Sequence, residues 1–80
     1  MKTIHIRYYA ILREQAGRSE EKLSTSATTP AQVFDELKSR YPFTLGAEQL
    51  KVAINTEFRD WQTPLQDGDQ LVFIPPVAGG

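Results

Sequence analysis

The chain has 80 residues, nine of them basic and ten acidic, which gives one small domain with a formal net charge of −1 at neutral pH. A near-neutral chain without a basic cluster is not expected to bind nucleic acid, and the absence of cysteine excludes a disulfide framework, a thiolate nucleophile and a cysteine-bound metal. No stretch approaches the roughly 20 apolar residues of a membrane span and the N-terminal segment lacks a signal-peptide pattern, so we expect a cytoplasmic protein without membrane contact.

The first third of the chain predicts a strand, a short helix and a second strand. Polar and apolar residues alternate over residues 2–9, which is typical of a β-strand. One face of this strand carries the apolar side chains of Ile4, Ile6 and Tyr8. Residues 10–16 have a helix-forming composition, and Gly17 is placed to end that short helix. Residues 20–26 are a weaker strand candidate, in which Leu23 is the apolar anchor.

The clearest local signal is the start of a longer helix. Thr29 is placed to cap it, Pro30 occupies the first helical position, and Gln32 stands at the spacing of a capping box. Pro42 is expected to end the helix, which then spans residues 30–41. An apolar stripe follows at helical spacing, made by Val33, Phe34, Leu37 and Tyr41. We interpret the opposite charged face as solvated, with one i,i+4 ion pair, and its members are Asp35, Glu36, Lys38 and Arg40.

The second half of the chain predicts three more strands and no second long helix. Residues 50–54 alternate, and a short strand is centred on Phe58. A tight turn at Asp67-Gly68 precedes residues 71–74, which are apolar on both faces. Because a strand that is apolar on both faces is buried on both, we expect the long helix to cover one side and a partner to cover the other.

A conventional active site is not evident in this sequence. His5 lies on the polar face of the first strand with no nucleophile or orienting group at a telling spacing, so we interpret it as a surface histidine. Asp67 and Asp69 flank Gly68, but the further oxygen ligands of a calcium loop are missing, which favours a simple turn. Trp61 is interpreted as packing at the edge of the domain.

The segment Pro75-Pro76-Val77-Ala78-Gly79-Gly80 is the remaining feature, and we expect a flexible tail of residues 75–80 after a domain of residues 1–74. Two prolines favour an extended backbone, and two glycines leave no side chain around the carboxylate of Gly80. Six residues reach at most about 20 Å, which is the depth of a substantial cleft. Activated as an acyl-adenylate, this carboxylate would become an electrophile for sulfur or for an amine. A functionless chain end is the alternative.

Four segments resemble the MoaD family, the small subunits of molybdopterin synthase. They are IRYYAILREQAG at 6–17, TTPAQVFDEL at 28–37, VAIN at 52–55 and PLQDGDQLVFIPPVAGG at 64–80, of which the last is by far the most specific. The resemblance implies an α+β, β-grasp (ubiquitin-like) fold, in which a mixed β-sheet packs on one main helix and a short second helix is added. It also implies a carrier that binds no permanent cofactor and works in a heterotetramer with a large, MoaE-like subunit that holds the catalytic residues.

In such a carrier, an E1-like, MoeB-like enzyme uses ATP to adenylate Gly80, and a sulfur donor system converts the carboxylate into a thiocarboxylate. The tail then enters the large subunit and donates sulfur to cyclic pyranopterin monophosphate. The resemblance assigns activation to Gly80, a contact with the activating enzyme to Arg13, and partner binding to the apolar residues before the tail and to the tail itself. These partner-binding residues are Phe73, Ile74, Pro75, Pro76, Val77, Ala78 and Gly79.

One departure from the family concerns the turn Asn55-Thr56-Glu57, where relatives often have Asn-Gly. Threonine tolerates the positive φ of a tight hairpin poorly, so we expect a wider turn here. Three other functions remain open at this point. They are a ubiquitin-like modifier conjugated to lysines, a sulfur carrier for another product such as the thiamin thiazole, and an interaction module whose tail is inert.

Overall fold

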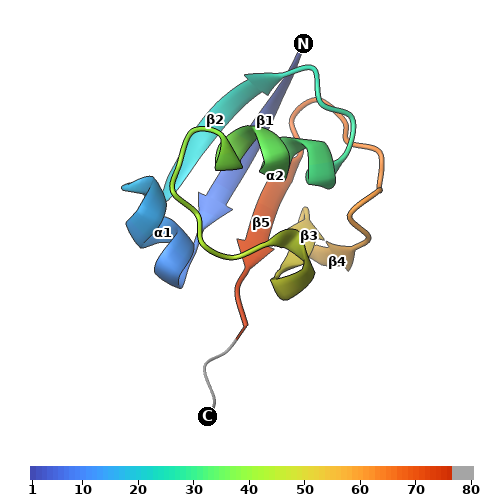
Figure 1. Ribbon diagram of the computed structural model, residues 1–80. Coiled ribbons are helices and arrows are strands. Elements are labelled where there is room, and N and C mark those ends of the chain that lie inside the picture. Colours follow the sequence, from blue (N-terminus) through green and yellow to red (C-terminus); the bar gives the residue numbers. More distant parts are fainter. Residues whose placement is uncertain (77–80) are drawn as a thin grey trace.

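The computed structural model describes residues 1–76, and these form a five-stranded mixed sheet with one long helix across it (Figure 1). The elements in chain order are β1 (Lys2–Tyr8), α1 (Ala10–Ala16), β2 (Glu20–Thr25), α2 (Pro30–Lys38), the 3₁₀ turn η1 (Ala47–Gln49), β3 (Lys51–Ile54), β4 (Glu57–Arg59) and β5 (Gln70–Ile74). The strand order is β2-β1-β5-β3-β4, with β1 and β5 parallel and the other pairs antiparallel. This arrangement confirms the predicted α+β, β-grasp fold.

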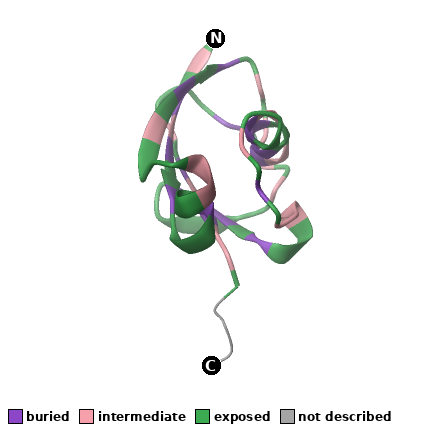
Figure 2. Cartoon of the chain, turned by 60° about the vertical axis from the view of Figure 1, so that its left-hand side comes forward, coloured by how far each residue is buried: buried purple, intermediate pink, exposed green. Residues whose placement is uncertain are grey.

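The core lies between the sheet and α2, and in Figure 2 the buried positions fall on the strands and on the side of α2 that faces them. The alternation predicted for β1 is confirmed, because Ile4, Ile6 and Tyr8 are all buried. Further large buried side chains come from α1, α2, β3 and β5, among them Leu12, Val33, Phe34, Leu37, Val52, Leu71 and Phe73. Each fully buried side chain of this kind stabilises the fold by roughly 1.5–3 kcal/mol.

The start of α2 follows the predicted signal with a shift of one residue. The Thr29 hydroxyl oxygen accepts the Gln32 backbone N–H at 3.3 Å, and Pro30 occupies the first turn. The Gln32 side-chain oxygen accepts the backbone N–H of Thr28 at 2.7 Å, so it returns to the residue before the cap and not to the cap itself. Two backbone N–H groups that the helix would leave unpaired are thereby satisfied.

The end of α2 differs from the prediction, since the helix stops at Lys38 and not at Tyr41. Pro42 disfavours helical backbone at Tyr41, and the Ser39 hydroxyl donates to the Glu36 carbonyl at 2.6 Å, a local bond that competes with helix continuation. The interpretation of a fully solvated charged face is also wrong for Glu36. Its carboxylate accepts the Thr25 hydroxyl at 2.7 Å as well as pairing with Arg40 at 3.2 Å.

The released Tyr41 takes part in a cluster around a buried carboxylate. The side chain of Glu21 is only 8% exposed, and it accepts hydrogen bonds from the hydroxyls of Tyr41, at 2.7 Å, and Tyr8. Arg18 approaches the second oxygen of the same carboxylate at 3.6 Å. This cluster joins the loop after α2 to β1 and β2, and the sequence patterns did not indicate it.

The turn between β3 and β4 is tighter than predicted. Ile54 pairs with Glu57, so only Asn55 and Thr56 lie in the turn, and their φ angles are 51° and 73°. A left-handed conformation costs a non-glycine residue roughly 1–2 kcal/mol. Asn55 offsets this cost by binding the start of β5, since it exchanges hydrogen bonds with the backbone of Gln70 at 2.9 and 3.0 Å and donates from its side chain to Asp69 at 2.9 Å.

Three further local predictions are confirmed. Gly17 ends α1 with φ 75°, and its N–H bonds the Arg13 carbonyl at 2.9 Å. Gly68 forms the predicted turn with φ 89°, while the preceding Asp67 carboxylate accepts the Thr3 N–H at 2.7 Å. Trp61 packs at the domain edge, where its ring lies parallel to that of Phe73 with centroids 5.7 Å apart. Within residues 1–76, the helices are too short or too polar for any of them to cross a membrane.

Candidate functional site: the open face of the sheet

The face of the sheet opposite α2 is the candidate site. On β5, Leu71 and Phe73 are fully buried beneath the helix, whereas Val72 and Ile74 point to the other face and are only half-buried. The expectation that both faces of this strand are buried is therefore wrong for the chain alone. Within residues 1–76 no element covers the outer side chains of β5, so Val72 and Ile74 stay partly accessible.

Pairing between the strands gathers apolar side chains on this face. Phe58 stands opposite Ala53, and Ala53 stands opposite Val72, so the three lie in one row across β4, β3 and β5. Phe58 is 69% exposed, and Tyr9, which follows the end of β1, is 44% exposed. We call Tyr9, Phe58, Val72 and Ile74 the apolar patch. Exposed apolar side chains that gather on one face mark an interaction site far better than scattered ones do.

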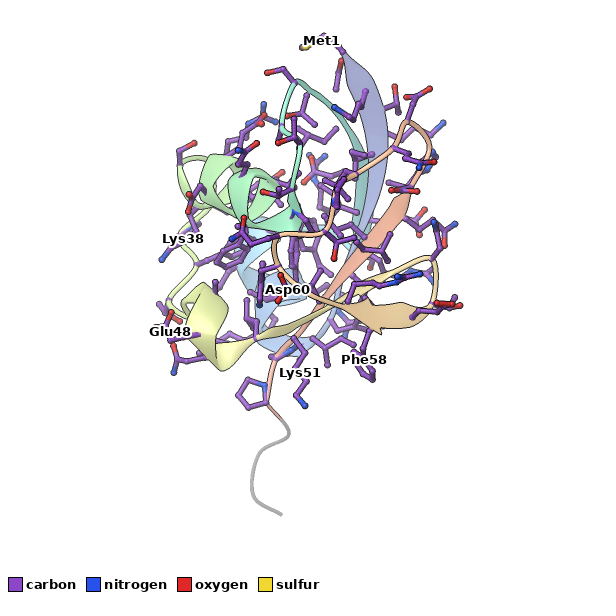
Figure 3. All side chains as sticks on the ribbon, turned by 90° about the vertical axis from the view of Figure 1, so that its right-hand side faces the viewer. Met1, Lys38, Glu48, Lys51, Phe58 and Asp60 are labelled. Carbon is purple, nitrogen blue, oxygen red and sulfur yellow. The ribbon has the colours of Figure 1, made fainter. Side chains whose placement is uncertain are left out.

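The apolar patch adjoins the start of the tail. Ile74 is the last residue of β5, and the chain leaves the sheet through the half-buried Pro75 and the exposed Pro76 (Figure 1). Lys51 pairs with Ile74, and its ammonium lies 6.0 Å from the centre of the Phe58 ring; both side chains lie near the base of the tail in Figure 3. A protein bound to the patch would therefore sit beside the point at which the tail begins.

The predicted site residues fall into four groups. Ile74, Pro75 and Pro76 lie in line at the edge of the patch, as expected for a segment that leads into a partner. Phe73 is 0% exposed and packs against Phe34, so the prediction that it contacts a partner needs correction: its contribution is to the core that holds β5 in place. Arg13 is exposed on α1. The remaining predicted residues, Val77, Ala78, Gly79 and Gly80, lie outside the described residues.

Sequence reasoning missed the roles of Phe58 and Tyr9 in this face. A signal for Phe58 was present, because an aromatic residue between Glu57 and Arg59 stands alone on its side of a strand. The two charged neighbours pair with each other at 3.1 Å on the other side. What the pattern could not reveal is that β4 is an edge strand with all three residues exposed, so that Phe58 points away from the core.

The other half of the open face, over β1 and β2, is polar. His5 lies here, half-buried and directly opposite Lys22, and Arg7 stands opposite Glu20. Asp67 and Asp69 do not face this region as a pair, since each carboxylate is engaged by backbone or side-chain donors of the neighbouring turns. Within residues 1–76 there is no group of three histidine or acidic side chains that could hold a metal ion.

Comparison with known proteins adds three findings. Residues 6–80 match the model of the ThiS family. The chain is 30% identical over 83 residues to the molybdopterin synthase sulfur carrier subunit of Mycobacterium tuberculosis, and the match covers 100% of both chains. It superposes on the solution structure of small archaeal modifier protein 1 from Methanosarcina acetivorans with a TM-score of 0.80 and 28% identity, covering 100% of this chain and 98% of the other.

A more distant solved structure shares the fold. It is a chain from the complex between subunits 1 and 2 of the molybdopterin-converting factor of Helicobacter pylori. The TM-score is 0.70 at 22% identity, and the match covers 98% of this chain and 99% of the other.

Proposed function

The chain belongs to the ThiS family, and from that membership we propose that it is the sulfur-carrying small subunit of a molybdopterin synthase. The observation that carries the proposal is the position of the apolar patch at the base of a segment that reads Pro-Pro-Val-Ala-Gly-Gly. A carrier needs a surface that other proteins can bind and a narrow segment that can enter their active sites. It does not need catalytic side chains of its own.

The chemistry we propose takes place at Gly80. An ATP-using, E1-like enzyme joins the glycine carboxylate to AMP and releases pyrophosphate. A sulfur donor system then displaces AMP and leaves a thiocarboxylate, so the cargo is one sulfur atom. The thiocarboxylate donates this sulfur to cyclic pyranopterin monophosphate inside a large subunit, and two such donations build the dithiolene of molybdopterin. This chain supplies the docking face and the reach of the tail, while the large subunit supplies the catalytic groups.

We propose that the large subunit binds the apolar patch and receives the tail in the same event. A binding site that begins at Ile74 orders the chain up to Pro75, and the two prolines limit the conformations that the next residues lose on binding. The complex between the two subunits of the Helicobacter pylori factor supports a partner of this kind.

Intact-mass spectrometry of the chain, isolated from cells that are making the cofactor, tests the sulfur chemistry. We expect a population in which one oxygen is replaced by sulfur, and fragmentation should place that sulfur on Gly80. The matched controls are a variant that lacks Gly80 and a variant with one residue added after it. Both should keep the fold, because β5 ends at Ile74, and both should carry no sulfur. Only free carboxylate in the wild-type chain, under conditions in which the cofactor accumulates, would contradict the proposal.

A ubiquitin-like modifier is the second candidate, favoured by the likeness to small archaeal modifier protein 1. In this role Gly80 would form an isopeptide bond with a lysine of another protein. The two functions leave different products, since a modifier yields larger species whose digests contain a branched peptide ending in Gly-Gly. Finding such peptides without any thiocarboxylate would favour the modifier over the carrier.

A further inference from the structure

The polar half of the open face forms a shallow groove next to the apolar patch. The groove has a volume of about 370 Å³ and runs over β2, β1 and β5 to the turn between β3 and β4. Its polar lining consists of His5, Arg7, Glu20, Glu21, Lys22, Gln70 and Thr56, and it shares Tyr9 and Val72 with the apolar patch. A protein that covers the patch therefore reaches the groove without a gap.

Two basic side chains, those of Arg7 and Lys22, line the groove beside one solvent-exposed carboxylate, that of Glu20. Arg7 pairs with Glu20 at 3.2 Å, but both side chains are more than half exposed, and such exposed pairs exchange readily for other partners. The second carboxylate of β2, that of Glu21, is held by Tyr8 and Tyr41 on the core side of the sheet. Among the described residues Lys22 has no acidic partner within 4 Å, and it stands beside His5. This basic strip lies on a chain whose net charge is −1.

Thr56 adds an observation of a different kind. Its φ of 73° is strained for a β-branched residue, and glycine would adopt the same turn freely. The hydrogen bonds that hold this turn on β5 all come from Asn55, and in residues 1–76 the Thr56 hydroxyl makes no hydrogen bond. The Thr56 side chain therefore adds no hydrogen bond to the turn, yet Thr56 lines the groove. Strained residues of this sort concentrate where a surface binds something.

We propose that the groove is a second contact area for the protein that docks on the apolar patch, and that it takes an acidic segment of that protein. Carboxylates of the segment pair with Lys22 and Arg7, and the Thr56 hydroxyl hydrogen-bonds at the far end of the groove. The proposal rests on the docking part of the proposed function and not on the sulfur chemistry. A peptide fits better than a nucleic acid, because the chain as a whole is acidic and its basic strip is short.

The test compares charge reversals in the full chain, titrated calorimetrically with the large subunit of the same organism. Lys22→Glu should weaken binding about tenfold or more, because it places like charges opposite each other, and it should flatten the salt dependence of the affinity. Lys38→Glu, which makes the same change of net charge on α2 at the other side of the domain, should alter the affinity less than about twofold. Equal affinities for the two variants would overturn the proposal.

The variant Thr56→Gly distinguishes a role of Thr56 in binding the large subunit from a role in the stability of the domain. We expect this variant to melt at a higher temperature than the wild type and yet to bind the large subunit several-fold more weakly. If the affinity is unchanged, Thr56 is no contact and the proposed extent of the groove is wrong. A variant that binds more weakly because it is misfolded would instead melt at a lower temperature, so the two explanations give opposite shifts.

A titration without the large subunit tests the groove independently of the proposed function. In amide NMR spectra, a hexaglutamate peptide should move the signals of Lys22, Arg7 and Thr56 in a saturable way, and hexaglutamine should not. Lys22→Glu should abolish these shifts. Shifts from hexaglutamate without binding of the large subunit would leave the groove in place and remove the docking proposal. If the large subunit binds but the peptide causes no shifts and Lys22→Glu has no effect, the docking proposal stands and the groove proposal is wrong.

Discussion

Replacing Glu21 by alanine should destabilise the domain far more than replacing its neighbour Glu20. The Glu21 side chain is 8% exposed and accepts the hydroxyls of Tyr8 and Tyr41, with Arg18 at 3.6 Å. The Glu20 side chain is 68% exposed, and its one ion pair is with Arg7. The two substitutions remove the same group from adjacent positions of β2, so the difference between them isolates the buried cluster.

The magnitude follows from the hydrogen bonds that each variant loses. A hydrogen bond to a charged group contributes about 1.5–3 kcal/mol, and Glu21→Ala removes two of them, so a loss of about 3–6 kcal/mol is expected. The loss is severe because Tyr8 is 1% exposed, and water cannot replace the missing acceptor without opening the core. A domain of this size has a free energy of unfolding of roughly 4–12 kcal/mol. Glu20→Ala removes only an exposed pair and should cost about 1 kcal/mol or less.

Urea unfolding followed by circular dichroism and by the fluorescence of Trp61 measures both variants, and coincident transitions establish that the unfolding is two-state. Thermal melts should show a fall of about 4–8 °C for each kcal/mol lost. Adding Tyr8→Phe to Glu21→Ala removes one stranded hydroxyl and should recover part of the lost stability. If Glu21→Ala unfolds within about 1 kcal/mol of Glu20→Ala, the buried cluster does not stabilise the fold and the reasoning is refuted.

Three further outcomes are expected. Burial, followed by the hydrogen bond to Glu21, raises the pKa of Tyr8 above its ordinary value of about 10, so the folded state keeps a proton that the unfolded state has lost above that pH. The stabilisation is therefore complete below about pH 10 and falls as the pH rises further, and a urea midpoint that stays constant from about pH 9 to 11 would contradict this. Ile74→Lys should weaken binding of the large subunit by placing an unpaired charge in the interface, while an unchanged calorimetric affinity would remove Ile74 from it. Thr29→Ala should lower the free energy of unfolding by about 1 kcal/mol in urea titrations through loss of the helix cap. An unchanged free energy would mean that Gln32 and Pro30 are enough to stabilise the start of α2.

Where a local signal has one meaning, the sequence was a reliable guide to the fold. Gly17 and the pair Thr29-Pro30 mark helix boundaries through backbone geometry that other parts of the chain do not change. The alternation of residues in β1 predicted its buried face correctly for the same reason, since one face of the strand is apolar and the other is polar. The resemblance to the MoaD family, carried most specifically by residues 64–80, then narrowed the possible folds to the β-grasp.

Where two local preferences conflict, or where a contact comes from a distant segment, the sequence did not decide. Thr56 disfavours a two-residue turn, but the turn forms because Asn55 bonds Gln70 and Asp69, which lie about a dozen residues further along the chain. The apolar helix pattern continues to Tyr41, yet the helix ends at Lys38, and the Tyr41 hydroxyl donates a hydrogen bond to the Glu21 carboxylate. Both errors are the result of tertiary contacts that outweigh local propensity.

The open face of the sheet illustrates the same limit on a single strand. Residues 71–74 are all apolar, so periodicity cannot tell which pair faces the core. The register decides it, because Leu71 and Phe73 pair with Ile6 and Tyr8 of β1, the residues that lie beneath α2. A slip of one residue would exchange the faces, but β5 is paired on both sides, with β1 and with β3, and such a slip would break both ladders. The pairing at the centre of the sheet therefore holds Ile74 outward, next to the point at which the tail begins.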